Sequence, residues 1–542
     1  MQNSLRRFRF SLRKYAILSL IAVVFMFSVL SLFFFRNKEP IIIKETQLPI
    51  HIEPTPTITF AESKTMTATA SPIPTPQKSS EIIIAKPKNK TEVIIDCFRK
   101  QWYNYKDKAM GHDYILPKSG SFRDDSKSGL IIFESLSTMA IMNLTEEIEE
   151  IIDFIYKEKL FKSDISSDFL ISSVLGSLIS SYEITKRKEL LNYVQRILSL
   201  LPRMESVVYP PMHYKFDGSS YLYEITPIIE SHKLGSIQIE FLYISEMEKN
   251  MIFAEKSLQF YRLLFSNSNE PGLISSSIIG YNGGSYNNVY SLQDDCSSIY
   301  DGLMKAIVFS NNSIPTGMFM LQDFIDRLNR DFFVRNGEKM ILVNEYCEGY
   351  QKDIHIDSAY IASLLLDYSK VSKNSTIEAI SYRVLDFFIN YTNNGHKLPP
   401  LISKRGFDDK ITTVDQKFMF CPYLFEALYK FWRHTNESKY CDIAWNLFLE
   451  INRTCSYNSI FTNVDYSLDD PFLDFVNPRL FSMTLKYLYL MFNDRINFNE
   501  WVFNSRGHPI PKWKYPIESL DKSAMNSIDP MFEPDEQYPF EG

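Results

Sequence analysis

CPYLFEALYKFWRHT, residues 421–435, sets apolar side chains at helical spacing around one carboxylate. The apolar positions are Leu424, Leu428, Phe431 and Trp432. Steps of three and four residues are those of one face of an amphipathic helix, so the stretch predicts a helix. Glu426 lies within that apolar stretch, and a buried carboxylate requires either a partner or a function.

The same helical period continues through most of the chain between about residues 93 and 492. One segment begins at Thr145 with acidic residues and carries Ile148, Ile151, Ile152 and Ile155. Another carries Phe481, Leu485, Leu488 and Phe492. Strand-like alternation is scarce, and a Gly- and Asn-rich stretch at 280–288 is typical of a loop. We expect an all-α domain of helix hairpins, stacked as a solenoid or closed into a ring, and the lack of a fixed repeat period disfavours the solenoid.

Residues 15–35 form an uncharged apolar run that, at about 1.5 Å per residue, is long enough to cross a hydrocarbon core of about 30 Å. Basic residues precede it at Arg6, Arg7, Arg9, Arg13 and Lys14. The positive-inside rule places residues 1–14 in the cytoplasm and the bulk of the chain across the membrane. A cleaved signal peptide is the alternative, although its apolar region is usually shorter. The pattern favours a single-pass type II membrane protein.

Residues 36–90 are rich in Thr, Ser and Pro and predict an extended stalk, because such a composition buries little apolar surface. Glycosylation sequons follow the anchor at Asn89, Asn143, Asn374, Asn390, Asn436 and Asn452. The six cysteines lack zinc-site spacing, and no disulfide can be assigned from them. A net charge of −7 without a basic stripe excludes a nucleic-acid partner. We expect a folded luminal domain over 91–515 and a polar tail over 516–542.

Further stretches share the aromatic, apolar character of residues 421–435. They are FRKQWYNYKDKAMGHDYILP (98–117), ESLSTMAIMNL (134–144), VLGSLISSY (174–182), LGSIQIEFLYIS (234–245), SSIYDGLMK (297–305), TLKYLYLMF (484–492) and FNSRGHP (503–509). In this order they resemble motifs of the class I α-1,2-mannosidases, glycoside hydrolase family 47. The resemblance implies an (α/α)7 barrel whose acidic pocket holds a calcium ion and the terminal α-1,2-linked mannose of a glycan.

The resemblance also implies a general acid and a general base, which inverting glycosidases hold about 6.5–9.5 Å apart. The family's acid and base positions fall here at Phe169, Ser297 and Tyr423. Other pocket acids are replaced at Lys233, near Asn477 and at Arg506. A phenyl ring carries no labile proton, and a phenol with a pKa of about 10 is a poor base at neutral pH.

A register shift of one residue would offer Asp168 as the acid. Neighbouring residues on a helix point about 100° apart, so we expect Asp168 to lie off the pocket face.

Four acids do stand at family acidic positions and are candidates for glycan binding. They are Glu134, Glu240, Asp301 and Glu426. The alternative is structural: Glu240 and Glu426 would pair with basic residues such as Lys233 or Arg433, and Asp301 would be solvated or cap a helix.

Calcium is possible but doubtful in this sequence. Ser505 keeps the hydroxyl and carbonyl oxygens of the family's calcium-binding Thr, and both suit a hard cation. Lys233 and Arg506 add positive charge where acids are missing. We expect His508 to pack in a turn before Pro509 rather than to bind a metal.

Three interpretations of function follow. The first is an inactive, membrane-anchored family member in the endoplasmic reticulum or Golgi that binds a mannose-type glycan or a glycoprotein. The second is an active, calcium-dependent α-1,2-mannosidase that trims high-mannose N-glycans. The third is a structural protein whose pocket is filled by Phe169, Tyr423 and Arg506.

Overall fold

The computed structural model describes one folded unit, whose residues fall in several ranges. They are 89–158, 160–161, 164–204, 210–216, 221–223, 227–280, 282–336, 339–342, 345–347, 350–351, 353–391, 397–406 and 410–514. The predicted cytoplasmic tail, the predicted anchor, all but the last two residues of the predicted stalk and the predicted C-terminal tail lie outside them. Among the described residues, no helix combines the length and the apolar composition needed to cross a membrane.

A ring of inner helices forms the centre of this unit. They are α3 (Leu130–Met142), η1 (Asp168–Leu175) with α5 (Gly176–Thr185), α8 (Gln238–Glu248), α10 (Asp294–Phe309), α12 (Tyr360–Ser372), α14 (Pro422–Thr435), and η5 (Leu480–Thr484) with α16 (Leu485–Leu490). Each contacts the next, and η5 closes the ring against α3. Helix α3 is buried almost all round, as expected of a helix packed on every side.

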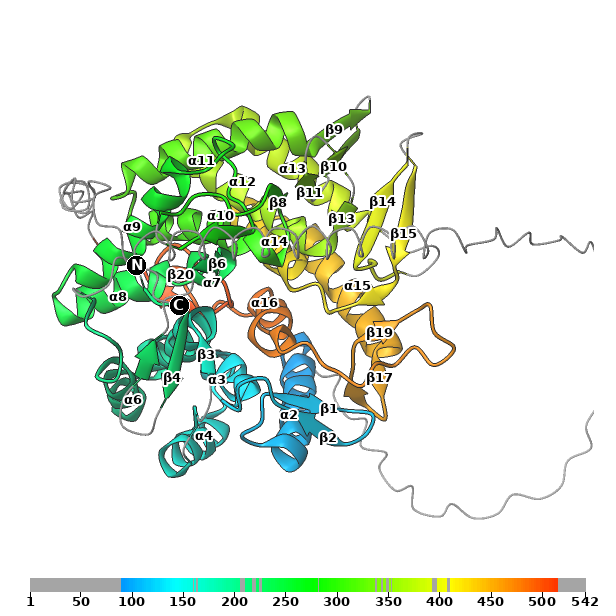
Figure 1. The fold of residues 1–542 in the computed structure, drawn as a ribbon. Helices are drawn as coiled ribbons and strands as arrows, with labels where there is room; N and C mark the ends of the chain where they lie inside the picture. The colour runs from blue at the N-terminus through cyan, green and yellow to red at the C-terminus, as the bar shows by residue number, and fades with distance from the viewer. Residues whose placement is uncertain are drawn as a thin grey trace, which may run out of the picture. The chain divides into compact units, whose positions relative to one another are not determined.

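A second helix packs outside each inner one. These outer helices are α4 (Thr145–Lys157), α6 (Lys188–Leu198), α9 (Ile252–Ser266), α11 (Pro315–Arg327), α13 (Ser375–Ile389), α15 (Lys439–Thr454) and α2 (Lys90–Ala109). Figure 1 shows α4, α6, α9, α11 and α13 at the periphery. Helix α4 buries the predicted isoleucine face together with Glu147, which Arg99 pairs at 2.7 Å, and exposes Glu146, Glu149 and Glu150, so its one apolar stripe packs inward. The paired inner and outer helices fit the (α/α)7 barrel, and the predicted helices at 145–157, 422–435 and 480–490 are confirmed.

Short antiparallel strands decorate the helices, so the expectation of an all-α chain was too narrow. They are β1 (Tyr114–Leu116), β2 (Ser121–Arg123), β3 (Asp164–Ser166), β4 (His213–Phe216), β5 (Tyr221–Tyr223), β6 (Ile228–Glu230), β7 (Ser277–Ile279), β8 (Val289–Ser291), β9 (Phe333–Asn336), β10 (Lys339–Leu342), β11 (Glu345–Cys347), β12 (Tyr350–Gln351), β13 (Asp353–His355), β14 (Ile402–Arg405), β15 (Ile411–Asp415), β16 (Lys417–Phe418), β17 (Ser456–Tyr457), β18 (Ile460–Phe461), β19 (Val464–Asp465), β20 (Trp501–Phe503) and β21 (Pro509–Pro511). The remaining short helices are α7 (His232–Gly235), η3 (Leu328–Phe332) and η4 (Ile356–Ala359). Such strands are shorter than the alternation needed to recognise a strand in sequence.

The last strands, β20 and β21, form a hairpin that packs against inner helices α10 and α5. Its turn carries residues 504–508, where Gly507 adopts a φ of +77° that favours glycine. A Cβ at Gly507 would also lie 2.8 Å from both Met483 Cγ and the Ser482 carbonyl oxygen. A glycine is therefore required for this turn to approach η5.

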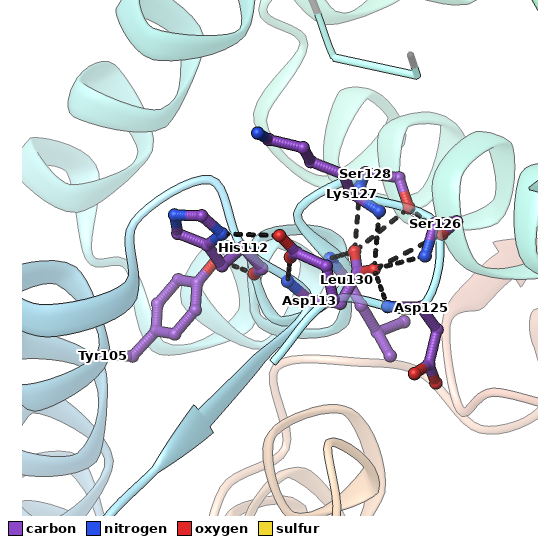
Figure 2. A network of polar contacts seen from close by, with 9 residues as sticks. Tyr105, His112, Asp113, Asp125, Ser126, Lys127, Ser128 and Leu130 are labelled. Carbon is purple, nitrogen blue, oxygen red and sulfur yellow. Dashed lines mark hydrogen bonds and ion pairs between the residues drawn. The ribbon is translucent and has the colours of Figure 1, made fainter. Parts of the chain in front are cut away.

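One carboxylate organises the loop that leads into α3 (Figure 2). Asp113 is 1% exposed and accepts backbone N–H groups on both oxygens. Oδ2 accepts from Asp125, Ser126 and Lys127 at 2.9, 2.7 and 2.8 Å, and Oδ1 accepts from Ser128 and Leu130 at 2.8 and 3.3 Å. Burial alone would raise the pKa of Asp113, but these N–H groups hold it below its usual value. The Asp113 loop thus fixes the start of the helix that carries Glu134.

Replacing Asp113 by Asn should lower the free energy of unfolding by roughly 2–4 kcal/mol, because the amide NH₂ turns donors toward N–H groups that need an acceptor. Thermal unfolding of the full-length protein followed by circular dichroism measures the loss. Asp107→Asn, at an exposed position of α2, is the matched control. Equal stability of the two variants would contradict an organising role for Asp113.

Candidate functional site

The four retained acids lie on four different inner helices, and all are buried. Glu134 on α3 is 0% exposed, Glu240 on α8 0%, Asp301 on α10 3% and Glu426 on α14 1%. Carboxylates in such surroundings must be paired, hydrogen-bonded or protonated. What this site can do therefore depends on the partners of these four side chains.

Lys305 joins two of them. Its Nζ lies 2.6 Å from Asp301 Oδ2 and 2.9 Å from Glu426 Oε1. It also donates to the carbonyl oxygen of Asn504, in the hairpin turn, at 3.3 Å. Burial raises the pKa of Asp301, and the nearby ammonium opposes that rise. The three side chains form a buried ion cluster, in which loss of one member leaves an uncompensated charge.

Lys430, one turn after Glu426 on α14, extends this cluster. Its Nζ lies 3.5 Å from Glu426 Oε1 and 2.7 Å from Asp367 Oδ2 on α12. Burial alone would raise the pKa of Asp367, but Lys430 and His434 hold it well below its usual range. Two lysines thus serve three carboxylates along α10, α12 and α14.

The partners suggested by the sequence were wrong. Arg433 pairs with Asp494 at 2.6 Å rather than with Glu426, because it lies in the last turn of α14, about 10 Å further along the helix axis. Lys233 pairs with Glu230 at 2.8 Å and not with Glu240. The expectation that Asp301 would be solvated or cap a helix was also wrong. It lies in the interior of α10, where the neighbouring helices exclude water from it.

Glu240 is held by the hairpin turn instead. Asn504 Nδ2 donates to its Oε1 at 2.5 Å and to the carbonyl oxygen of Ser172 at 2.8 Å. A Cβ at Gly176 would lie 2.9 Å from Glu240 Oε1, so a glycine gives this contact its room. Burial raises the pKa of Glu240 to about 8, although Asn504 opposes that rise. Glu240 is consequently protonated at neutral pH.

Glu134 belongs to a third buried group. It accepts from Ser173 Oγ at 2.6 Å. Lys486 on α16 donates to Ser137 Oγ at 2.7 Å and to the carbonyl oxygen of Gly507 at 2.5 Å. Burial places the pKa of Lys486 well below its usual value, and Glu134 opposes that effect. Hairpin turn and inner helices are thus bonded together by polar side chains.

His508 completes this group and packs in the turn, as expected. Its Nδ1 lies 2.7 Å from Ser137 Oγ, and the side chain is 0% exposed. Burial places its pKa well below the ordinary value, and the nearby positive charges of Lys486 and Arg506 act in the same direction. His508 therefore stays neutral and holds the turn against α3.

Arg506 forms an ion pair with Asp168, with Nη2 2.7 Å from Asp168 Oδ2. The sequence predicts that Asp168 lies off the pocket face; in the structure it is the first residue of the π-helical segment η1 and pairs with Arg506. Burial alone would raise the pKa of Asp168, but Arg506 holds it below its usual value. Asp168 is ionised, and its carboxylate is paired with the guanidinium of Arg506.

The positions at which the resemblance implied lost acids carry side chains without a carboxyl group. Phe169 is 8% exposed and Tyr423 3%. The Tyr423 ring lies 5.1 Å from Arg479 Cζ, measured at the ring centroid. Asn477 donates to the Met419 carbonyl oxygen at 3.4 Å. Ser297 lies near the start of α10, and its side chain is outside the described part of the structure.

The residues around Ser505 do not fit the calcium ion that the resemblance implies. Ser505 Oγ donates to the Ser236 carbonyl oxygen at 3.4 Å, and the next residue, Arg506, brings a guanidinium. Asp301 and Glu426 are already paired with lysine. Calcium takes six to eight oxygen ligands, several of them carboxylates. Within the described ranges, no group of three or more acidic, His or Cys side chains is arranged to hold a metal.

Sequence reasoning missed Lys305, Lys430 and Lys486. Each is a single basic residue inside an apolar helical stretch, in GLMKAIV, ALYKFW and TLKYLYL. A lysine amid buried helix residues is rarely unpaired, so this pattern was the available signal. Asn504 had no comparable signal, since only the hairpin brings it to Glu240.

The model of "Glycosyl hydrolase family 47" matches residues 97–512. Mannosyl-oligosaccharide 1,2-alpha-mannosidase IB of Mus musculus is 24% identical over 466 residues, which cover 78% of this chain and 70% of the mouse protein. The endoplasmic reticulum mannosyl-oligosaccharide 1,2-alpha-mannosidase of Homo sapiens is 24% identical over 462 residues, which cover 78% of this chain and 64% of the human protein.

Among solved structures, the chain is similar in fold to alpha-1,2-mannosidase from Trichoderma reesei, with a TM-score of 0.71. The match is 18% identical in sequence and covers 78% of this chain and 99% of the other.

Replacing Lys305 by Met should lower the free energy of unfolding by about 3–5 kcal/mol, because Asp301 and Glu426 would lose their shared cation in a buried site. Adding Glu426→Gln to Lys305→Met should restore part of the loss. Lys439→Met, which removes an exposed lysine at the start of α15, should change little. Thermal unfolding of the three variants measures these differences. Equal effects of Lys305→Met and Lys439→Met would contradict the buried cluster.

Glu240→Gln should change how stability depends on pH. Because folding raises the pKa of Glu240 from 4.5 to about 8, the folded chain keeps a proton that the unfolded chain releases. The stability of the native protein should therefore fall by about 1 kcal/mol per pH unit between these values, relative to the variant. We expect similar unfolding temperatures for the two proteins at pH 5 and a more stable variant at pH 8. A constant difference across this range would contradict the raised pKa.

Proposed function

The chain belongs to glycosyl hydrolase family 47, and from that premise we propose that it is a member without hydrolytic activity that binds a mannose-type N-glycan or a glycoprotein partner. The observation that carries the proposal is the Arg506–Asp168 ion pair, together with the lysines that occupy the retained acids Asp301 and Glu426. These contacts replace a free acidic pocket with a neutralised one.

Inverting hydrolysis needs one protonated carboxyl group beside the leaving oxygen and one ionised carboxylate beside a water. A general acid that acts at neutral pH has a raised pKa and reaches the substrate. Asp168 is ionised and bound to Arg506, and Glu426 is bound to lysine. Neither is available as a proton donor, and the Phe169 ring cannot replace one.

One observation favours the alternative of an active α-1,2-mannosidase. Asp168 is ionised while Glu240 is protonated, and a pair of carboxyl groups with separated pKa values is the usual pattern of a base and an acid. Glu240, however, is 0% exposed and accepts a hydrogen bond from Asn504, so its proton has no path to a sugar in this conformation. We therefore place the inactive function first.

The third interpretation, a purely structural protein, shares the filled site with the first. Both interpretations account for the buried Phe169 and Tyr423, so a glycan-binding measurement distinguishes between the two interpretations. The inactive function retains a recognition surface, which would include the partly exposed Arg506 beside Asp168.

We place this function in the secretory pathway. The human relative named above is an endoplasmic reticulum enzyme by name, and both named mannosidases act on mannosyl-oligosaccharides by name. We propose a type II membrane protein of the endoplasmic reticulum or Golgi, with a cytoplasmic tail over 1–14, an anchor over 15–35, a stalk over 36–90, a luminal domain over 91–515 and a polar tail over 516–542.

The full-length protein, incubated with a high-mannose oligosaccharide, should release no hexose above a control without protein. Mass spectrometry follows the loss of each hexose, and an active family member serves as the positive control. The result should be the same with calcium and with a chelator, because the residues around Ser505 do not fit the ion. Trimming that is lost in Asp168→Asn or Glu426→Gln would overturn the proposal and establish the active enzyme.

The same protein should be retained on an immobilised high-mannose glycan and released by free mannose oligosaccharide. A complex-type glycan without terminal mannose is the control. Retention without trimming supports the proposal of an inactive, glycan-binding member. Absence of both trimming and retention would leave a protein partner or the structural role.

A further inference from the structure

A cavity of about 340 Å³ lies between the C-terminal halves of α10, α12 and α14 and the hairpin strand β20. A water molecule takes about 30 Å³ in the liquid, so the cavity has room for a small ligand. Basic side chains line it at Lys305, Lys370, Lys373, Lys430, His434 and Lys512. Among the described residues of this wall, only Asp367 is acidic. The excess of positive charge points to an anionic ligand.

Asp367 does not cancel this charge, because it is already bonded. Lys430 lies 2.7 Å from its Oδ2, and His434 Nε2 lies 3.7 Å from its Oδ1. Lys305 is likewise held by Asp301 and Glu426. The charges of Lys305, Lys430 and Asp367 are therefore balanced by contacts within the protein. The remaining lysines, Lys370, Lys373 and Lys512, determine the charge that a ligand meets.

Lys512 is the residue that most needs a partner. It follows β21 and is partly buried, and its backbone N–H donates to the Glu500 carbonyl oxygen at 2.8 Å. Within the described ranges, its amino group has no hydrogen bond or ion pair. Burial lowers the pKa of Lys512, and repulsion from Lys430 adds to this effect while Asp367 opposes it. A bound anion would offset both the cost of burying the Lys512 ammonium and its repulsion from Lys430.

The lysines at the end of α12 are not needed to satisfy the end of that helix. The backbone N–H groups of Lys373 and Asn374 already donate to the carbonyl oxygen of Ser369. Lys370 is 40% exposed and pairs with Glu378 at 2.6 Å, so an anion at the rim would share its ammonium with that carboxylate. Aromatic side chains of Phe498, Trp501 and Phe503 also line the cavity.

We propose that this cavity binds a small tetrahedral oxyanion of the phosphate or sulfate class, held by Lys512 with Lys370 and Lys373 at its rim. Strand β20 lines this cavity together with Lys305 and Lys430 of the buried cluster, while the turn after β20 reaches Glu240 and Asp168. The proposal does not depend on whether the chain trims glycans.

Calorimetric titration of the full-length protein with inorganic phosphate, at ionic strength held constant with chloride, tests the site. We expect one phosphate per chain, with sulfate competing for it. Lys512→Met should weaken the affinity at least tenfold without lowering the unfolding temperature, because this lysine has no partner within the described residues to lose. Lys439→Met removes the same charge outside the cavity and should bind as the parent protein does.

A second titration with a hexose monophosphate distinguishes an inorganic ion from a phosphate ester. Tighter binding of the ester, again lost in Lys512→Met, would support the site and assign the organic phosphate as its ligand. Absence of phosphate binding, or equal weakening by Lys512→Met and Lys439→Met, would overturn the proposal.

Discussion

The burial of charge in a helical ring is the constraint on which the rest of this structure depends. Inner helices carry Glu134, Glu240, Asp301 and Glu426 into surroundings that exclude water. An ionised group there must be paired, hydrogen-bonded or neutralised by a proton. The chain uses all three means: Lys305 pairs two acids, Ser173 donates to a third, and Glu240 keeps its proton.

The C-terminal hairpin connects these groups. Asn504 bonds Glu240 and the backbone of η1, His508 and Gly507 bond Ser137 and Lys486, and Arg506 bonds Asp168. A turn of five residues thus bonds polar and charged side chains that come from several inner helices. Internal cations neutralise the carboxylates Asp168, Asp301 and Glu426 in these surroundings.

The charges around strand β20 of the same hairpin are less evenly matched. The turn meets acids that are matched by cations. Strand β20 faces a cavity in which the Lys512 amino group has no ion pair among the described residues, because Asp367 already pairs with Lys430. Internal pairing is complete near Asp301 and Glu426 and incomplete near Lys512. The β20–β21 hairpin therefore contacts paired acids through its turn and lines a basic cavity through β20.

The order of its motifs indicated the family by resemblance, and the sequence by itself determined the helical periods of segments such as 145–157 and 422–435. These are local properties, readable from spacing and residue type. Only the tertiary structure decided which cation serves which acid: Lys305 rather than Arg433 for Glu426, Asn504 rather than Lys233 for Glu240, and Asp168 for Arg506. Ion pairs act over a few ångströms, and the fold closes such a distance between Asp168 and Arg506, which lie 338 positions apart in the chain.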